Sequence, residues 1–166
     1  LFPISKNELS KKNISLAGSE RISFAVWTTT PWTLLANVAV ALNPGLDYVF
    51  VKTKAHGIVI VSESLLPSVM KLASPEAPED FEILLRRKGV ELEGLLAEHP
   101  FVSRCSRVVL ADYVSAADGT GCVHTAPGHG IDDYRTGAKY KLSTLMPVDG
   151  KGKFTGEAFV GNHLGV

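Results

Sequence analysis

Two short stretches of the 166-residue sequence gather side chains that could bind or activate a substrate. The first, WTTTPWT at residues 27–33, places four threonine hydroxyls among two tryptophan rings and a proline. The second, GTGCVHTAPGHGIDDY at residues 119–134, supplies two imidazoles and two adjacent carboxylates. Hydroxyls hold water or sugar hydroxyls, an ionised aspartate pairs with an ammonium group, and an imidazole can shape a pocket wall. If the two stretches meet in the fold, they suit an amino-acid ester on a ribose.

The threonine-rich stretch has two interpretations. It follows the strand-like run ISFAV, and Pro31 ends that strand because it has no N–H to donate. The hydroxyls could simply bond the local backbone at a strand end, or they could form the floor of a pocket that binds water. They could be nucleophiles only beside a base, and none is adjacent in the sequence. The residues concerned are Thr28, Thr29, Thr30 and Thr33.

The polar residues of the second stretch also have ordinary structural roles available. Asp132 or Asp133 could cap a helix, and one cap leaves the other carboxylate free. His124 could be a satisfied core histidine in a strand, and His129 a solvated loop residue. The same groups could instead ligate a metal, but His-x4-His-x2-Asp-Asp is not the helix-borne H-E-x-x-H pattern. We therefore expect no metal here.

Several other classes of protein are not indicated. Neither GTGCVH nor GKGKFT matches a phosphate-binding loop, and no G-x-S-x-G elbow is present. Cys105 and Cys122 form no C-x-x-C motif, so we expect two ordinary thiols in a reducing cytosol. Basic and acidic residues number 17 each, which gives a formal net charge of zero. Binding of nucleic acid must then be local or depend on a partner, because phosphate-neutralising proteins are usually basic.

No membrane partner is expected. The longest apolar runs, such as VAVAL at 38–42, fall far short of the roughly 18 residues of a membrane span. The first residues lack the order of a signal peptide. The sequence also starts without Met and stops at GNHLGV without a cap or tail, so we expect a piece of a longer polypeptide.

The rest of the sequence must supply the elements that position these stretches. A tight turn is expected near His56-Gly57, between two of the predicted strands. Residues 5–20 are polar and predict a loop or loosely held ribbon, whereas 89–101 give no clear assignment. Apolar runs predict strands over 21–29, 47–54, 57–63, 81–88 and 106–115.

Helical patterning is scarcer. Residues 62–73 have helical apolar spacing, with Ser62 or Ser64 as a possible N-cap and Pro67 tolerable only in the first turn. Residues 131–142 predict a helix that is capped by an aspartate and ends with lysines. The stretch 148–154 predicts a hairpin turn.

These elements favour a β-rich mixed α+β fold, in the form of a closed, β-barrel-like domain with a few peripheral helices. Consecutive apolar positions, as at 48–51, suit strands buried on both faces. The chain is long enough to bury one core without disulfides. We expect a polar entry segment over 1–20 and one domain over 21–166.

At this level of detail the sequence resembles a known family. WTTTPWTLLAN (27–37) and GTGCVHTAPGHGIDDY (119–134) are similar to the signature peptides of the editing domain inserted in isoleucyl-tRNA synthetase, a class I aminoacyl-tRNA synthetase; HPF (99–101) and MPVDGKGKF (146–154) are similar too. The sister valyl and leucyl enzymes typically have Arg-Pro and an acidic residue in place of Pro31-Trp32, and lack HTAPGHG. Departures from the family are Leu35, where proline is common, and Cys122, where a small aliphatic residue is usual.

The resemblance implies a β-barrel-like insertion that hydrolyses valine misattached to isoleucine tRNA. The ATP-site motifs His-Ile-Gly-His and Lys-Met-Ser-Lys-Ser do not occur, so the chain is expected to edit but not to charge tRNA. No cofactor is then expected, since ATP and magnesium would serve only the absent catalytic body. The implied partners are the 3′ end of isoleucine tRNA carrying valine and the rest of the synthetase. We expect the cytoplasm as its location, with an organelle left open.

The resemblance also assigns roles by position. Asp133 matches the residue that holds the α-ammonium group, and His124 matches the wall that admits valine and rejects the extra carbon of isoleucine. Asp132 is the expected helix cap. The residues expected to position the water and the terminal adenosine, catalytically or by binding, are Trp27, Thr28, Thr29, Thr30 and Trp32.

Two alternatives remain beside this hydrolase. One is a tRNA-end binding module without turnover, which needs the parent synthetase to deliver substrate. The other is a metal-dependent hydrolase that uses His124, His129 and the aspartate pair. Basic residues could bind tRNA locally or form a solvated face; they are Arg86, Arg87, Lys88, Lys139 and Lys141.

Overall fold

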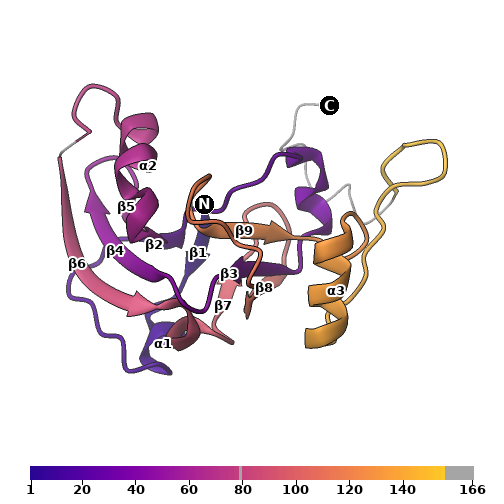
Figure 1. The fold of residues 1–166 in the computed structure, drawn as a ribbon, viewed down its shortest axis with the longest axis horizontal. Helices are drawn as coiled ribbons and strands as arrows, with labels where there is room; N and C mark the ends of the chain where they lie inside the picture. Colours follow the sequence, from indigo (N-terminus) through magenta and orange to yellow (C-terminus); the bar gives the residue numbers. More distant parts are fainter. Residues whose placement is uncertain (79, 156–166) are drawn as a thin grey trace.

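The computed structural model describes residues 1–78 and 80–155 and arranges them as two mixed β-sheets with short helices (Figure 1). In the five-stranded sheet β2 and β5 run parallel, and the other neighbouring strands run antiparallel. In order across the sheet, its strands are β1 (Phe2–Ile4), β2 (Ile22–Phe24), β5 (Gly57–Ser62), β4 (Asp47–Thr53) and β6 (Phe81–Lys88).

The four-stranded sheet carries part of the candidate site. Its central strand β3 runs parallel to β8 and antiparallel to β9, and the register places Val40 opposite His124. The strands in order are β7 (Leu96–Glu98), β8 (Cys105–Leu110), β3 (Ala39–Leu42) and β9 (Cys122–Thr125).

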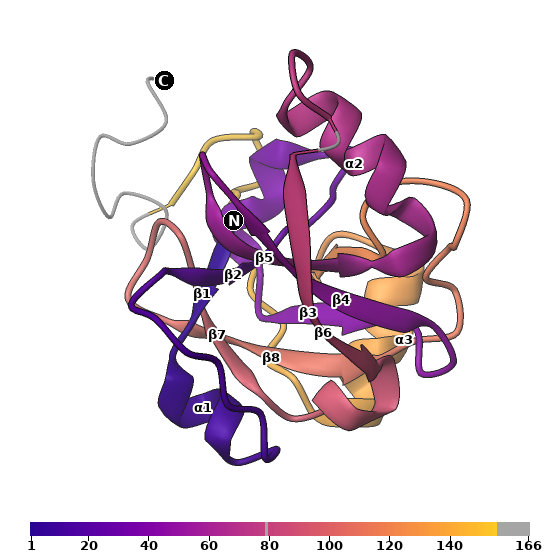
Figure 2. The same ribbon diagram turned by 90° about the vertical axis from the view of Figure 1, so that its left-hand side faces the viewer.

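Short helices connect the strands and cover the outer faces of the sheets. Leu66 and Met70 of α2 cover the five-stranded sheet, and Tyr140 of α3 packs on the four-stranded sheet, so the two helices lie on opposite sides (Figure 1). In the view turned by 90°, α1 lies at the end of the molecule away from α2 (Figure 2). The α-helices are α1 (Lys6–Ser10), α2 (Leu66–Ala73) and α3 (Ile131–Tyr140), and the 3-10 helices are η1 (Pro31–Ala36), η2 (Glu63–Leu65) and η3 (Gly89–Leu92).

The main core lies between the two sheets. Phe24 and Phe50 of the first sheet share one apolar cluster with Val40 and Val108 of the second. Each fully buried side chain of this size stabilises the fold by about 1.5–3 kcal/mol. Along β4, alternate residues face this core and α2, which confirms the expectation of strands buried on both faces. This packing holds β3 and β9, and hence the site, on a rigid base.

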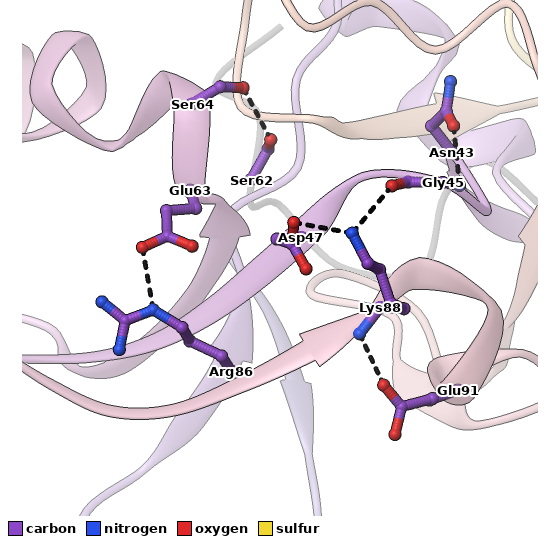
Figure 3. A network of polar contacts seen from close by, with 9 residues as sticks. All are labelled: Asn43, Gly45, Asp47, Ser62, Glu63, Ser64, Arg86, Lys88 and Glu91. Carbon is purple, nitrogen blue, oxygen red and sulfur yellow. Dashed lines mark hydrogen bonds and ion pairs between the residues drawn. The ribbon is translucent and has the colours of Figure 1, made fainter.

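The mixed α+β class with few helices is confirmed, but the expected closed barrel is wrong. Within the described residues no hydrogen-bonded ladder joins the two sheets, and each remains open. The physical reason lies at the edges. On the edge strand β6, Arg86 pairs with Glu63 and Lys88 pairs with Asp47 (Figure 3). Arg87 of the same strand pairs with Glu91. Charged side chains along an edge strand disfavour pairing with a further strand.

Locally encoded features are largely as expected. The β4–β5 hairpin turns just before Gly57, whose φ of +71° needs a glycine, and Val148 pairs with Phe154 in the expected hairpin. The strand expected over 21–29 ends at Phe24, and Trp27 forms an isolated bridge. Residues 89–101, left unassigned, form η3 and β7.

Two expectations near helices are wrong. Residues 6–10 of the expected loop form α1, because Ser5 accepts a hydrogen bond from the N–H of Glu8 and Leu9 is buried in the core. Neither Ser62 nor Ser64 caps α2; their hydroxyls bond each other at 3.0 Å, and η2 precedes the helix. The division of the chain at residue 20 stays a prediction. No helix within the described ranges has the length and apolar character needed to cross a membrane.

Candidate functional site

The structure brings the two stretches together. The N–H of Trp27 donates to the carbonyl of Cys122 at 2.7 Å, and the N–H of His124 donates to the carbonyl of Trp27 at 3.0 Å. The threonine-rich peptide therefore leaves the five-stranded sheet and continues along the edge of β9. Backbone hydrogen bonds alone thus join two stretches that lie more than 90 residues apart in the sequence.

The glycines before β9 make this approach possible. Gly119 has φ of +78°, and a Cβ there would lie 2.7 Å from Cγ of Trp27. Gly121 has φ of +76°, and a Cβ there would lie 2.4 Å from Cβ of Ser62. A side chain at either position would push the chain away from its neighbour. The bend at Gly119 therefore seats the Trp27 ring.

The threonine hydroxyls form a compact turn. Thr28 Oγ1 accepts from the N–H of Thr30 at 3.0 Å, and the hydroxyls of Thr30 and Thr33 lie 3.2 Å apart. Thr33 Oγ1 donates to the Thr30 carbonyl at 2.8 Å. Thr29 is exposed. The hydroxyls therefore serve both roles considered for them. They bond the local backbone, and the turn they stabilise places Thr33 against His124.

His124 is held by hydrogen bonds at both ring nitrogens. Asn37 Nδ2 lies 2.8 Å from the Ala39 carbonyl, which only accepts, so this amide nitrogen is the donor. The same Nδ2 lies 2.8 Å from His124 Nδ1, so Nδ1 accepts. His124 Nε2 therefore carries the hydrogen and donates to Thr33 Oγ1 at 3.0 Å. Ser106 Oγ completes the chain by donating to Asn37 Oδ1 at 2.5 Å.

This arrangement keeps His124 neutral. Its pKa is lowered to about 4, mainly by burial and to a smaller extent by the nearby His99 and His129. The side chain is only 5% exposed. Because Nδ1 is already an accepting atom and Nε2 already a donating one, neither is available as a base or as a metal ligand without breaking a bond. His124 can shape a wall and present a fixed donor.

Asn37 was not identified from the sequence as a site residue. Its partners His124 and Ser106 are 87 and 69 residues away, so no local motif marks them. One signal was present: Asn37 is a polar residue that directly precedes the apolar run 38–42, and a buried amide must find partners. That reasoning predicts a network but not its members.

A cavity of about 310 Å³ opens beside this network. It is lined by Trp32, Thr33, His129 and residues 146–149. Trp32 is 63% exposed, so its ring is available for stacking. His129 Nε2 is enclosed and has no hydrogen-bond partner within the described residues. An unpaired buried nitrogen costs about 1–3 kcal/mol, which a bound polar group would offset.

Asp133 lies in the first turn of α3, just after the loop that joins β9 to this helix. Its Oδ2 accepts from the N–H of Ala126 at 2.8 Å. Burial is the largest effect on its pKa and raises it, while that hydrogen bond and His129 act in the opposite direction. Within residues 1–78 and 80–155, no hydrogen bond joins Asp133 to the threonine-rich turn at 28–33.

The expected aspartate cap of α3 is wrong. The cap position is Gly130, which reaches the helix in an extended conformation and makes no side-chain cap bond. Asp132 instead forms an exposed ion pair with Arg135 at 3.3 Å. Both aspartates still favour the helix because acidic groups in the first turn interact well with its positive end.

A further feature of the site is how its possible metal ligands are arranged. Within the part of the chain that the structure describes, no three or more His, Cys, Asp or Glu side chains are grouped so that they could hold a metal ion. His124 and His129 are close enough to influence each other electrostatically, but His124 has both nitrogens engaged.

Comparison with known proteins agrees with the sequence resemblance. A family model described as the editing domain of leucyl-tRNA synthetase matches residues 4–159. The isoleucine–tRNA ligase of Kosmotoga olearia is 54% identical over 135 residues, which cover 81% of this chain and 14% of that protein. The isoleucine–tRNA ligase of Fervidobacterium pennivorans is 56% identical over 134 residues, which cover 80% of this chain and 14% of that protein. The chain thus spans about a seventh of these relatives.

Solved structures agree in fold. The crystal structure of GlLeuRS-CP1 superposes with a TM-score of 0.64 at 17% identity, covering 86% of this chain and 60% of that one. The Plasmodium knowlesi cytosolic leucyl-tRNA synthetase editing domain gives 0.64 at 18% identity, covering 84% and 61%. The far higher identity to isoleucine–tRNA ligases agrees with the predicted isoleucyl type. The chain therefore belongs to the editing-domain family of the class I aminoacyl-tRNA synthetases, and its half-identical relatives are isoleucine–tRNA ligases.

Proposed function

We propose that the chain hydrolyses the ester that joins valine to the 3′ end of isoleucine tRNA, by means of a positioned water and without a metal. The observation that supports this most directly is the seating of His124 as a neutral, fixed donor against Thr33, beside a cavity with an exposed tryptophan. Such a wall discriminates by shape rather than by charge. The reaction would take place in the cytoplasm, as part of a larger synthetase.

An editing site is needed in addition to the site that charges the tRNA, because valine and isoleucine differ little in size. One methylene in an apolar pocket is worth only about 1–3 kcal/mol, a general value for which discrimination between isoleucine and valine is itself the usual example. A second pocket that excludes the larger amino acid multiplies the discrimination. A rigid wall suits this task, because a side chain with both ends bonded cannot move aside for an extra carbon.

The proposed chemistry needs no protein nucleophile. Water held by the threonine hydroxyls attacks the ester carbonyl, the bond from the acyl carbon to the ribose oxygen breaks, and that oxygen leaves with a proton from the water. Asp133, ionised, binds the α-ammonium group and so orients the ester. Trp32 and His129 line the cavity where the terminal adenosine would lie. Orientation of bound groups supplies much of the rate in such reactions.

The test is deacylation of valyl- and isoleucyl-tRNA(Ile), with and without a chelator. We expect selective loss of valine, unaffected by the chelator. Asp133→Ala should abolish most of this activity, whereas the matched control Asp132→Ala, which removes an exposed ion pair, should retain it. His124→Ala should increase hydrolysis of correctly charged isoleucyl-tRNA(Ile). The proposal is wrong if Asp132→Ala loses activity while Asp133→Ala keeps it.

The balance of charge favours a second candidate, a tRNA-end binding module that needs the parent synthetase. The net charge is zero, and three of the five candidate basic residues are paired with acidic ones. The weak electrostatic attraction expected from this surface would leave tRNA binding to other parts of a synthetase. A folded chain that binds the 3′ end without turnover would establish this second candidate.

A further inference from the structure

The turn that joins β7 to β8 contains the HPF motif, which the proposed mechanism does not use. His99 is 6% exposed, and its Nε2 lies 2.8 Å from the carbonyl of Leu34 in η1. From the same turn, Arg104 Nη2 donates to the carbonyl of Leu35 at 2.6 Å. Two side chains of one turn therefore contact successive carbonyls at the end of η1.

These contacts matter because η1 is a weak element by itself. It is a six-residue 3-10 helix without a side-chain cap at its N-terminus. Runs of 3-10 helix longer than three or four residues are uncommon, and the last carbonyls of any helix lack partners within it. Within the helix end, the N–H of Asn37 donates to the Leu34 carbonyl at 2.9 Å. The turn from 99 to 104 adds a second donor to the Leu34 carbonyl and a donor to the Leu35 carbonyl.

The hydrogen-bond pattern fixes the state of His99. Its Nδ1 accepts from the N–H groups of Phe101 at 3.1 Å and Val102 at 3.2 Å. Nε2 must then carry the hydrogen that is donated to Leu34. Burial is the main cause that lowers the pKa of His99, which keeps the ring neutral, and the rings of Phe2 and Phe101 pack edge-on against it at 5.5 and 5.8 Å.

We propose that His99 is a positioning residue of the editing site: by holding the Leu34 carbonyl, it sets the places of Thr33 and Asn37. Thr33 directly precedes Leu34, and Asn37 closes the same turn of helix. These two residues hold the two nitrogens of His124. His99 thus acts on the discriminating wall through η1, without contact with the substrate. This proposal rests on the proposed hydrolysis of valyl-tRNA(Ile).

Two substitutions separate the two functions of the His99 ring. His99→Asn keeps an acceptor for the N–H groups of residues 101 and 102, as in an Asx turn, but is too short to reach Leu34. His99→Gln places an amide N–H near the original Nε2 but loses the local acceptor. His56→Asn is the matched control, because His56 is exposed in the β4–β5 turn.

The first measurement is the kinetics of valyl-tRNA(Ile) deacylation by the chain, in the longest polypeptide that carries it. We expect His99→Asn to lower kcat by tenfold or more, since displacement of about 1 Å can cost roughly a hundredfold. The KM should change little, His99→Gln should restore most of the rate, and His56→Asn should match wild type. A merely structural role in the turn predicts the reverse order, with Asn active and Gln impaired, and that order would overturn the proposal.

The second measurement does not depend on activity. Nitrogen NMR of the His124 ring reports its tautomer, which should be the Nε2–H form in wild type and in His99→Gln, and a mixture in His99→Asn. A wild-type spectrum in His99→Asn overturns the positioning role even if no variant is active. If His99→Asn loses the Nε2–H form of His124 while the wild-type chain does not hydrolyse valyl-tRNA(Ile), the positioning role is upheld and the proposed hydrolysis is rejected. If His99→Asn does not fold, a folded His99→Gln with the wild-type tautomer supports the proposal, and one without it contradicts it.

Discussion

Two polar networks of this molecule differ in almost every physical respect. One runs from Ser106 through Asn37 and His124 to Thr33, is largely buried, and carries no formal charge. The other lies on the surface around β6 and consists of ion pairs, among them Glu63 with Arg86 and Asp47 with Lys88 (Figure 3). The first lies beside the candidate cavity, and the second does not line it.

The two networks differ in how well each can hold a site in one geometry. Exposed ion pairs are worth about 0–1 kcal/mol, because water and salt screen them. A buried neutral network gains little per bond, but the loss of one member leaves its partners unsatisfied at a cost of about 1–3 kcal/mol each. The neutral network is therefore the one that can hold a wall in a single position. Chemistry that depends on shape is expected there, whereas the charged network can change without consequence for the site.

The largest expected effect comes from the centre of the buried network. Asn37→Ala removes the partners of His124 Nδ1, Ser106 Oγ and the Ala39 carbonyl at once. The free energy of unfolding should fall by about 2–4 kcal/mol, as measured by urea denaturation. Asn7→Ala, in the exposed part of α1, is the control and should change it by less than about 0.5 kcal/mol. Equal effects of the two substitutions would show that the buried network does not stabilise the fold more than an exposed polar residue does.

The sequence was informative where neighbouring residues determine the structure. The turn before Gly57 and the hairpin from Val148 to Phe154 could both be predicted, because the residues that favour a turn are the residues that form it. The meeting of the two chemical stretches could be expected from their residue types. The backbone pairing of Trp27 with β9 that brings them together could not, since nothing local specifies it.

The predictions that were wrong or incomplete mostly depend on contacts between residues that are far apart in the sequence. Whether a sheet closes depends on which edge strands meet, and the charged partners of β6 come from elements distant in sequence. The cap of α3 was assigned to an aspartate because aspartates are good caps, whereas the extended chain at Gly130 places Asp132 and Asp133 inside the first turn. Asn37 was missed because its partners are far away in sequence.

The next effect in size is a dependence of stability on pH. The pKa of His124 is about 4 in the folded chain and 6.5 as the ordinary value, so between these values the unfolded chain binds more protons. Stability is therefore fully present above pH 6.5 and falls as the pH drops towards 4. Between pH 6.5 and 5 the loss should be about 2 kcal/mol, and His99, whose pKa is also lowered, adds in the same direction.

This pH dependence can be checked by urea denaturation of wild type and His124→Gln. The variant lacks the titrating ring, so its stability should fall less steeply between pH 6.5 and 5. Asp133 acts in the opposite direction: its raised pKa means that the folded chain holds the proton more tightly, so its ionisation costs stability as the pH rises through its range. A slope as steep in the variant as in wild type would show that His124 is not buried as a neutral group.

The smallest expected effect comes from the exposed ion pairs of β6. Arg86→Ala and Lys88→Ala break exposed ion pairs with Glu63 and Asp47 at 2.8 and 2.7 Å. Each should lower the free energy of unfolding by less than about 1 kcal/mol, and the difference should shrink as salt is added. If this surface is a solvated face, the KM for valyl-tRNA(Ile) should not change either. An increase in KM that weakens with salt, at nearly unchanged stability, would instead show that these side chains leave their acidic partners to bind the phosphates of the tRNA, because only a role in binding raises KM without destabilising the fold.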